Sequence, residues 1–275
     1  MESISCIICG SDNNSNYKKF KDILNPLLTF NIVKCHCGFL YLNPRPDSKE
    51  ISKYYDDSYF PYTRNKKAIN LLYKWIKKIT FFWKYKILLK HYPFCNKLLD
   101  YGGGTGDFSS YMINKNISAL NYDPNTGSAV NLSDSSLKRK FDIITLWHSI
   151  EHVHDIKDLF KQIKFLLKEK GLLFIAIPNH DAYERENFFI DDWVAYDIPR
   201  HLYHFNTQTF ERLLEKNKFI IKKSYSMYQD TLFNILMSSN DKNPIRLLYR
   251  IFCSIISIFF NKKKSSSLLF VCKKQ

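Results

Sequence analysis

The sequence lacks a long apolar segment and a visible signal peptide. The uninterrupted apolar part of residues 245–260 is shorter than the roughly 20 residues that a bilayer-spanning helix needs. Residues 1–15 are polar and contain two cysteines, unlike a secretory signal peptide. The seven cysteines also lack the ordered spacing of a disulfide framework. These absences argue against a membrane-spanning or a small secreted protein, and we expect a cytoplasmic one.

No single segment holds the basic residues, and no internal repeat is evident. The chain has 41 Lys and Arg against 26 Asp and Glu, a formal net charge of +15. Nucleic-acid-binding proteins usually concentrate such charge on one face or arm. Here it is spread along the chain, together with abundant Asn, Ile, Phe and Tyr. We therefore expect no nucleic-acid partner and interpret the charge as favouring anionic partners, such as a sugar phosphate or a membrane surface.

Residues 98–108 carry the most informative pattern. A short apolar run ends in Asp100, and Gly102, Gly104 and Gly106 follow before a segment that can begin a helix. Glycines remove the side chains that would keep a nucleotide-like ligand away from the backbone. The Gly-x-Gly-x-Gly spacing differs from the G-x-G-x-x-G pattern that aims a helix N-terminus at the pyrophosphate of a dinucleotide. S-adenosylmethionine has no phosphate, and Asp100 suits its ammonium group.

Later segments extend a pattern of strands and helices. Residues 118–123 predict a short strand that ends in Asp123, placed to accept hydrogen bonds from both hydroxyls of a ribose. Such an acid also occurs in dinucleotide enzymes, so it indicates a nucleoside without choosing the cofactor. Residues 141–153 predict a strand that runs into a polar turn containing histidines. A helix over 156–168 and a strand over 172–177 are expected to follow.

Taken together, these segments resemble a class I S-adenosylmethionine-dependent methyltransferase, in the branch near the quinone O-methyltransferases and the methyltransferases found among surface-polysaccharide genes. The similarity runs from about residue 96 to 221 and includes Asp142, the Glu-His-Val triplet at 151–153 and the segment 199–205. It implies an α/β fold with a Rossmann-like sheet and helices on both faces. It also implies that the cofactor contacts come from Asp100, Gly102, Gly104, Gly106, Asp123, Asp134 and Trp147.

The segment between Asp123 and Phe141 departs from this pattern. Related enzymes place a helix and a third strand there, often ending in an acid that meets the adenine amino group. This chain has only residues 124–140, so we expect a shortened strand over 129–132 with Asp134 as the adenine partner. A trimmed sheet edge would weaken cofactor binding. It leaves a non-catalytic binding module as an alternative to an enzyme.

Two close cysteine pairs near the N-terminus resemble a zinc ribbon. Cys6 and Cys9 form one pair, Cys35 and Cys37 the other, and a glycine follows each pair. Four thiolates close a tetrahedral site, so the expected zinc is structural rather than catalytic. The second pair has one intervening residue where the usual knuckle has two, and that residue, His36, could compete as a ligand. Four free thiols in a disordered tail are the alternative.

These patterns divide the chain into three parts. We expect a zinc-ribbon-like module at 1–47, a helical connector at 48–95 and an S-adenosylmethionine-binding methyltransferase domain at 96–275. Residues 66–91 predict an amphipathic helix that covers the core, roofs the substrate pocket, or does both. Its apolar positions are Leu72, Trp75, Ile76, Ile79 and Trp83, and the lysines on its other faces are Lys74, Lys77, Lys78 and Lys84.

Histidines are the candidates for catalysis. Methyl transfer from a sulfonium depends mainly on alignment, but an alcohol acceptor still needs a base, and histidine is the usual one. His148 ends a predicted strand that faces the cofactor cleft, and the resemblance places the loop of His201 over the pocket. His204, beside a predicted helix start, is expected to be structural. Glu151 and His152 form either a metal pair, as in some quinone methyltransferases, or a group in which Glu151 caps or orients the following helix.

The C-terminal part contains one more element of functional interest. Residues 245–264 predict either a buried helix before a last strand at 267–272 or an interfacial helix with flanking lysines at a membrane. The resemblance implies a methyltransferase acting on a small molecule, and we expect the acceptor to be a hydroxyl of a saccharide or nucleotide sugar in surface-polysaccharide biosynthesis. A quinone- or lipid-type acceptor is the alternative within enzymes.

Overall fold

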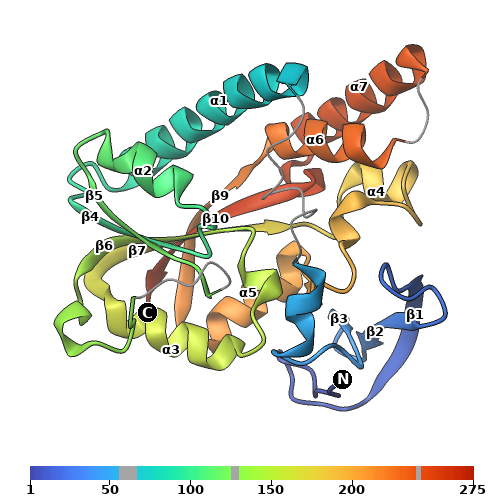
Figure 1. Cartoon of the computed structure of the whole chain (residues 1–275), viewed down its shortest axis with the longest axis horizontal. Coiled ribbons are helices and arrows are strands. Elements are labelled where there is room, and N and C mark those ends of the chain that lie inside the picture. The colour runs from blue at the N-terminus through green and yellow to red at the C-terminus, as the bar shows by residue number, and fades with distance from the viewer. Residues whose placement is uncertain (56–66, 125–129, 240–242) are drawn as a thin grey trace.

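A six-stranded sheet forms the centre of the molecule (Figure 1). The computed structural model describes residues 1–55, 67–124, 130–239 and 243–275, with the backbone alone for residues 67–76. Four strands run parallel, and the strand nearest the C-terminus is antiparallel to both of its neighbours. Across the sheet, the strands follow the order β5 (Ser118–Tyr122), β4 (Lys97–Tyr101), β6 (Phe141–Trp147), β7 (Leu167–Pro178), β10 (Ser267–Lys274) and β9 (Phe219–Ser226).

Helices cover both faces of this sheet, which confirms the predicted α/β fold (Figure 1). Successive side chains of β7 point to opposite faces: Phe174 packs in the apolar cluster that contains Leu88, and Ile175 packs in the one that contains Phe160. Strands buried on both faces need nearly continuous apolar runs, and β6 and β7 have them. The first face carries α1 (Lys67–His91) and α2 (Asp107–Ile113), and the second carries α3 (Ile156–Leu166) and α5 (Thr207–Lys216).

A second, smaller sheet joins the N-terminal part of the chain to the predicted methyltransferase part. Its strands are β1 (Asn14–Lys21), β2 (Thr29–Cys35), β3 (Leu40–Leu42) and β8 (Tyr203–His204). Leu40 of β3 pairs with His204 of β8, so a strand from the predicted methyltransferase part completes the sheet of the N-terminal part. The division of the chain at residue 47 stays a prediction.

The segment before β6 is not a strand where it is described. Residues 130–132 have no strand conformation, so that part of the prediction is wrong, and residue 129 lies outside the described residues. A short 3-10 helix, η3 (Ser135–Leu137), follows instead. Among the described residues the sheet therefore ends at β5, because this segment is rich in Asn and Ser, which compete for backbone hydrogen bonds.

The connector forms the predicted helix, α1, although residue 66 lies outside the described residues. The side chains of Leu72, Trp75, Ile76 and Lys74 also lie outside them. Farther along α1, Trp83 packs on the core and Ile79 is exposed. The helix thus covers one face of the sheet.

The C-terminal helices lie at the side of the sheet. Of the two alternatives for residues 245–264, the buried helix is wrong: α7 (Pro244–Phe260) is helical, but only Ser254 and Ile258 of it are buried. It packs beside α6 (Tyr228–Ser238) and α4 (Tyr183–Asn187) rather than across the sheet. In the part of the chain that the structure describes, no helix combines the length and apolarity needed to cross a membrane. The other short helices among the described residues are η1 (Glu50–Tyr54), η4 (Ile150–His152), η5 (Val194–Tyr196) and η6 (Lys262–Lys264).

Candidate active site and zinc centre

The loop between β4 and α2 packs closely against the protein at Gly102 and Gly103, and its backbone is accessible at Gly104. Gly102, Gly104 and Gly106 have φ angles of 72°, 54° and 76°, a region that L side chains adopt rarely. A Cβ on Gly103 would lie 2.1 Å from Oδ1 of Asn121, whereas a Cβ on Gly104 would meet no atom within 4 Å. The loop therefore fits a ligand that approaches the backbone at Gly104.

Asp100, at the carboxyl end of β4, is buried beside a cation. Its Oδ1 accepts a hydrogen bond from Oγ1 of Thr145 at 2.7 Å. Burial raises the pKa of Asp100 to about 6, while the Thr145 hydroxyl and the charge of Lys84 act in the opposite direction. The Nζ atom of Lys84 lies 4.1 Å from the centroid of the Trp147 ring. The surroundings of Asp100 thus accommodate the ammonium group of Lys84 from α1. The same surroundings suit the ammonium group of the cofactor that we predict to contact Asp100.

Sequence analysis did not identify Lys84 as a residue of the site. Helical spacing places it on a face other than the apolar one, but its long side chain reaches back over the sheet. Burial lowers the pKa of Lys84 to about 8, and the charges of Asp100 and Asp230 oppose that effect. The lysine therefore belongs to the same pocket as Asp100.

The other predicted cofactor residues differ in their surroundings. Asp123 is buried after β5, and its Oδ2 accepts a hydrogen bond from the N–H of Gly104 at 2.8 Å. Trp147 has a buried Nε1–H without a hydrogen-bond partner among the described residues, a donor available to a ligand. Asp134 is exposed, and its Oδ1 accepts from the N–H of Ser136 at 2.8 Å, capping η3. Asp100, the glycine loop, Asp123 and Trp147 thus fit a nucleoside cofactor, while the role of Asp134 stays a prediction.

His148 follows β6 with a φ angle of 54° and forms an ion pair with a residue far along the chain. Its Nε2 lies 2.7 Å from Oδ2 of Asp230 in α6, and its Nδ1 lies 3.6 Å from Oε1 of Glu151. Burial by itself lowers the pKa of His148, but Asp230 and then Glu151 raise it to about 9 overall. At neutral pH the ring therefore carries its proton. Sequence analysis did not identify Asp230, because nothing local links it to β6.

Glu151 is a fully buried carboxylate among histidines. Neither of its oxygens has a hydrogen-bond partner within the described part of the chain. Its Oε1 lies 4.0 Å from Nε2 of His201. The ligand atoms of Glu151, His152 and His201 all lie within 4.8 Å of one another, so this group has the spacing to hold a cation as well as to move a proton. Glu151 does not cap the next helix, because the side chain of Asp155 accepts from the first turn of α3.

His201 has one ring nitrogen committed to the backbone. Its Nδ1 lies 2.9 Å from the carbonyl oxygen of Ala195, which favours a proton on Nδ1 in the neutral ring. Its Nε2 lies 3.8 Å from Oδ2 of Asp197 and faces Glu151. The ring of His152 packs 4.7 Å away, and burial, then the charge of His201, lower the pKa of His152 to about 4. His201 therefore has a nitrogen that can accept a proton between two carboxylates.

The four predicted zinc ligands lie together. The Sγ atoms of Cys6, Cys9, Cys35 and Cys37 are all within 4.8 Å of one another, at 3.6 Å for Cys6 to Cys37 and 3.4 Å for Cys9 to Cys35. Zn–S bonds of about 2.3 Å in a tetrahedron separate the sulfurs by roughly 3.8 Å. The four sulfurs therefore fit one zinc ion, and His36, with Nδ1 3.7 Å from Sγ of Cys35, is not needed as a ligand.

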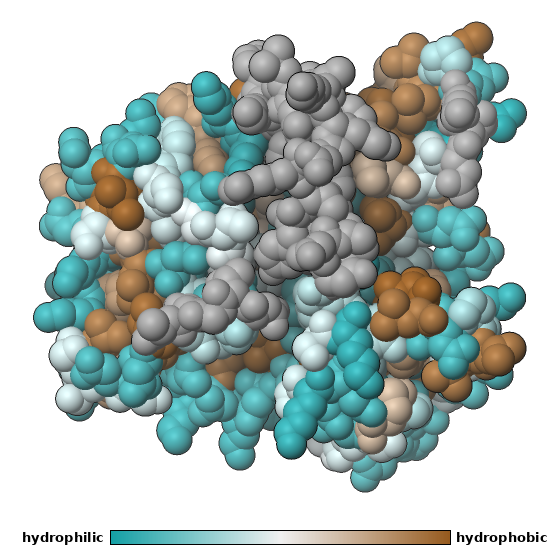
Figure 2. Space-filling model, in the orientation of Figure 1, coloured by the Kyte–Doolittle hydropathy of each residue, from teal (hydrophilic) through white to brown (hydrophobic). Residues whose placement is uncertain are grey.

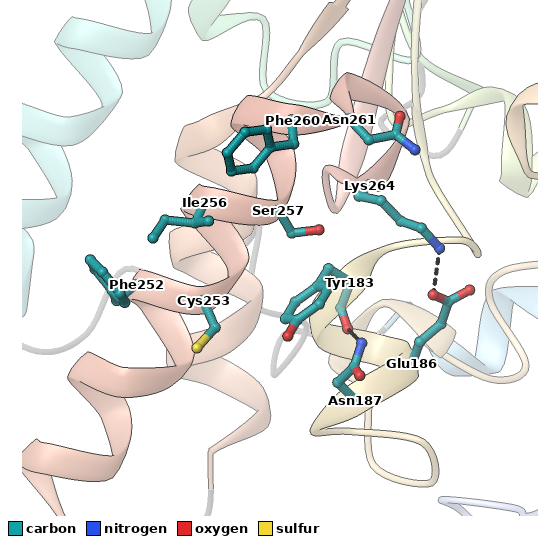
Figure 3. A pocket seen from close by; sticks show the side chains of 10 residues that line it. All are labelled: Tyr183, Glu186, Asn187, Phe252, Cys253, Ile256, Ser257, Phe260, Asn261 and Lys264. Carbon is teal, nitrogen blue, oxygen red and sulfur yellow. Dashed lines mark hydrogen bonds and ion pairs between the residues drawn. The ribbon is translucent and has the colours of Figure 1, made fainter.

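A groove between α4 and α7 contains none of the predicted site residues (Figure 3). Its lining includes Tyr183 and the apolar side chains of Phe252 and Phe260. Lys264 and Glu186 border it, with Nζ 2.5 Å from Oε2. The groove therefore belongs to the exposed side of α7 and not to the glycine loop.

The fold and the site define the class. An open α/β sheet with a glycine loop after β4 and buried acids at the carboxyl ends of β4 and β5 is the arrangement of a class I S-adenosylmethionine-dependent methyltransferase. The family described as "Methyltransferase domain" matches residues 65–222, and the chain belongs to this family. No curated protein matches the chain.

Solved structures share the fold at low sequence identity. The chain is 17% identical to phosphoethanolamine N-methyltransferase 2 of Haemonchus contortus, solved with S-adenosyl-L-methionine, over 95% of this chain and 69% of that one, with a TM-score of 0.51. It is 16% identical to geranyl diphosphate C-methyltransferase of Streptomyces coelicolor A3(2), over 80% of this chain and 88% of that one, with a TM-score of 0.48. At such identities the likeness concerns the fold alone.

Proposed function

We propose that this methyltransferase modifies a hydroxyl group of a saccharide or nucleotide sugar used in surface-polysaccharide biosynthesis. The observation that carries the proposal is the buried group of His201 and Glu151, because a hydroxyl must lose a proton when it accepts a methyl group. The net charge of +15 supports an acceptor that bears phosphate.

His201 is the proposed base. When bound, S-adenosylmethionine supplies a methyl group on a positively charged sulfur. The hydroxyl proton passes to Nε2 of His201, since Nδ1 is committed to the carbonyl of Ala195. Glu151 and Asp197 lie 4.0 Å and 3.8 Å from Nε2 and stabilise the protonated ring. His148, already protonated and paired with Asp230, holds the carboxylate of Glu151 in place.

The test is a survey of acceptors. Purified protein is incubated with S-adenosylmethionine and, separately, with nucleotide sugars, free saccharides and quinols, and S-adenosylhomocysteine and acceptor masses are measured. We expect turnover with a nucleotide sugar and a product that carries one O-methyl group. Methylation of quinols alone, or of a nitrogen or carbon atom, would contradict the proposal.

The exposed face of α7 supports a lipid- or quinone-type acceptor as the second candidate. Ile245, Phe252, Phe259 and Phe260 are each more than half exposed, and hydrophobic residues gather over this helix (Figure 2). Lys262 and Lys263 follow at its end. An amphipathic helix flanked by lysines suits an anionic membrane surface, and we propose that residues 245–264 make such a peripheral contact.

We propose that the four-cysteine group holds a structural zinc ion. None of the seven cysteines forms a disulfide, which fits a reducing compartment such as the cytoplasm. Four thiolates leave no open coordination position, so the ion stabilises the N-terminal sheet and takes no part in methyl transfer.

A further inference from the structure

Several buried polar atoms of Arg185 and of the side chains around Tyr196 have no hydrogen-bond partner among the described residues. The centroid of the Tyr196 ring lies 5.6 Å from that of Trp193, 6.1 Å from that of His180 and 6.0 Å from that of His204. Nε1 of Trp193, Nε2 of His180, Nε2 of His204 and Nε of Arg185 are all buried without a hydrogen-bond partner among the described residues. Buried polar atoms are nearly always bonded in folded proteins, so this concentration calls for a ligand.

Two of these atoms can only donate. The indole of Trp193 and the guanidinium of Arg185 carry N–H groups and no acceptor. The imidazoles of His180 and His204 can present an N–H as well, according to tautomer. The missing partner is therefore a group rich in acceptors.

Arg185 also carries a charge that its neighbours only partly offset. Its side chain is 9% exposed, and its Nη2 lies 3.4 Å from Oε1 of Glu186. The other carboxylate oxygen of Glu186, Oε2, lies 2.5 Å from Nζ of Lys264. Burial, followed by the positive charges of Arg185, Lys18 and Lys34, lowers the pKa of His180 to about 3. The interior beside Arg185 is thus electropositive, which favours an anion.

Glu184 does not supply that anion in full. One of its oxygens accepts a hydrogen bond from Oγ of Ser266, and the indole of Trp193 and the charge of Arg185 favour its charged form, although burial outweighs them. Burial raises the pKa of Glu184 to about 7, so about half of these side chains are uncharged near neutral pH. In that form Glu184 can itself donate a hydrogen bond to a ligand.

We propose that Arg185, with Trp193, His180 and His204, binds an anionic group of the methyl acceptor, a phosphate or a carboxylate. An anion supplies acceptors for the unpaired donors and the charge that a buried guanidinium needs. The site follows the carboxyl end of β7, where open α/β sheets bind ligands, and His204 lies three residues after His201. The assignment of this anion to the acceptor rests on the proposed function, with the hydroxyl at His201.

The test uses the full-length protein and simple anions. Inorganic phosphate, diphosphate and acetate are titrated by calorimetry into wild type, Arg185→Gln and Arg139→Gln, the last an arginine exposed at the surface beside Glu169. We expect either the phosphates or acetate to bind wild type and Arg139→Gln with equal affinity. The affinity of Arg185→Gln for that anion should be roughly 10- to 100-fold lower. The affinity for S-adenosylhomocysteine should stay the same in all three. Comparing the affinities for phosphate and acetate shows whether the site binds a phosphate or a carboxylate.

Equal anion affinity of Arg185→Gln and wild type, or no binding of any probe to wild type, would overturn the inference. If Arg185→Gln does not fold, Trp193→Phe is the second variant, because it removes one donor and keeps an aromatic ring. It should weaken the binding of the same anion several-fold. Different results would contradict the proposed hydroxyl acceptor and the proposed anion site. Intact Arg185-dependent anion binding without sugar methylation contradicts only the hydroxyl acceptor, whereas equal KM values for neutral and anionic sugars contradict only this site.

Discussion

The backbone N–H of Gly104 donates a hydrogen bond to Oδ2 of Asp123 at 2.8 Å. This contact joins the glycine loop after β4 to the acid after β5, two features that the sequence predicts separately. The acid therefore fixes the loop, in addition to the contact with the ribose hydroxyls that we predict for its carboxylate. A change at Asp123 should therefore affect both the glycine loop and the binding of the cofactor.

Replacing Asp123 with Ala should weaken S-adenosylmethionine binding by about tenfold or more, because a charged acceptor of two hydroxyls is lost. Calorimetric titration measures the affinity, and circular dichroism checks the fold. Asp134→Ala is the matched variant: its carboxylate caps an exposed 3-10 helix, and the effect should be smaller. A well-folded Asp123→Ala protein with unchanged affinity would refute the ribose assignment.

Replacing His201 with Ala should lower turnover by roughly 10²- to 10⁴-fold, with little change in cofactor affinity, because the proton acceptor is lost. His148→Ala should cost less, since that ring is already protonated and acts through Glu151. Initial rates and cofactor Kd values of both variants decide the matter. Near-normal turnover in both would mean that neither histidine is the base.

The purified protein should contain about one zinc ion per chain, as a closed four-thiolate site holds. Cys6→Ser and Cys37→Ser should release the metal and lower the melting temperature, whereas Cys253→Ser, a cysteine of α7, should do neither. Elemental analysis under reducing conditions is the measurement. A metal-free native protein would exclude this centre.

Asp142 gives a prediction for stability against pH. Burial alone raises its pKa, but Lys168, whose Nζ lies 2.6 Å away, and two backbone N–H groups lower the pKa below the ordinary value of 3.8. The native state thus binds the proton more weakly than the unfolded chain does. The resulting stability is complete above about pH 5 and is lost as the pH falls through the folded pKa.

Asp142→Asn should therefore reduce the free energy of unfolding by about 1–3 kcal/mol at pH 7, with a difference that shrinks below about pH 4. Urea denaturation at several pH values measures it. Glu169→Gln, at an exposed ion pair with Arg139, should change stability by about 0.5 kcal/mol or less. A pH-independent difference for Asp142→Asn would contradict the ion-pair explanation.

The α7 face should bind vesicles that contain anionic lipid and bind neutral vesicles more weakly, because Lys262 and Lys263 flank its apolar side chains. The double variant Phe259→Ser, Phe260→Ser should reduce vesicle flotation several-fold. Ile113→Ser, which removes an exposed apolar side chain at the end of α2, is the control. Equal flotation of all proteins would remove the membrane contact from the proposal.

Local sequence patterns were sufficient to predict the central strands of the main sheet and the glycine loop. The alternation and continuity of apolar residues mark β6 and β7, and glycine spacing marks the loop after β4, because these signals depend on neighbouring residues alone. The same reasoning failed for residues 130–132 and did not choose between a buried and an exposed position for α7. There, the presence or absence of a neighbouring element decides the structure, and a sequence window does not contain that neighbour.

The sequence by itself determined the α/β order, the cysteine pairs, and the acids and glycines that follow the first strands of the main sheet. Only the tertiary structure decided that Asp230 pairs with His148, that Lys84 lies over Trp147, and that Arg185 lies near His180. These contacts join residues from different helices and loops, so they exist only after the elements pack. The shifted pKa values of Lys84, His148 and His180 and the unpaired donors depend on burial and on neighbouring charges, which are properties of the folded chain.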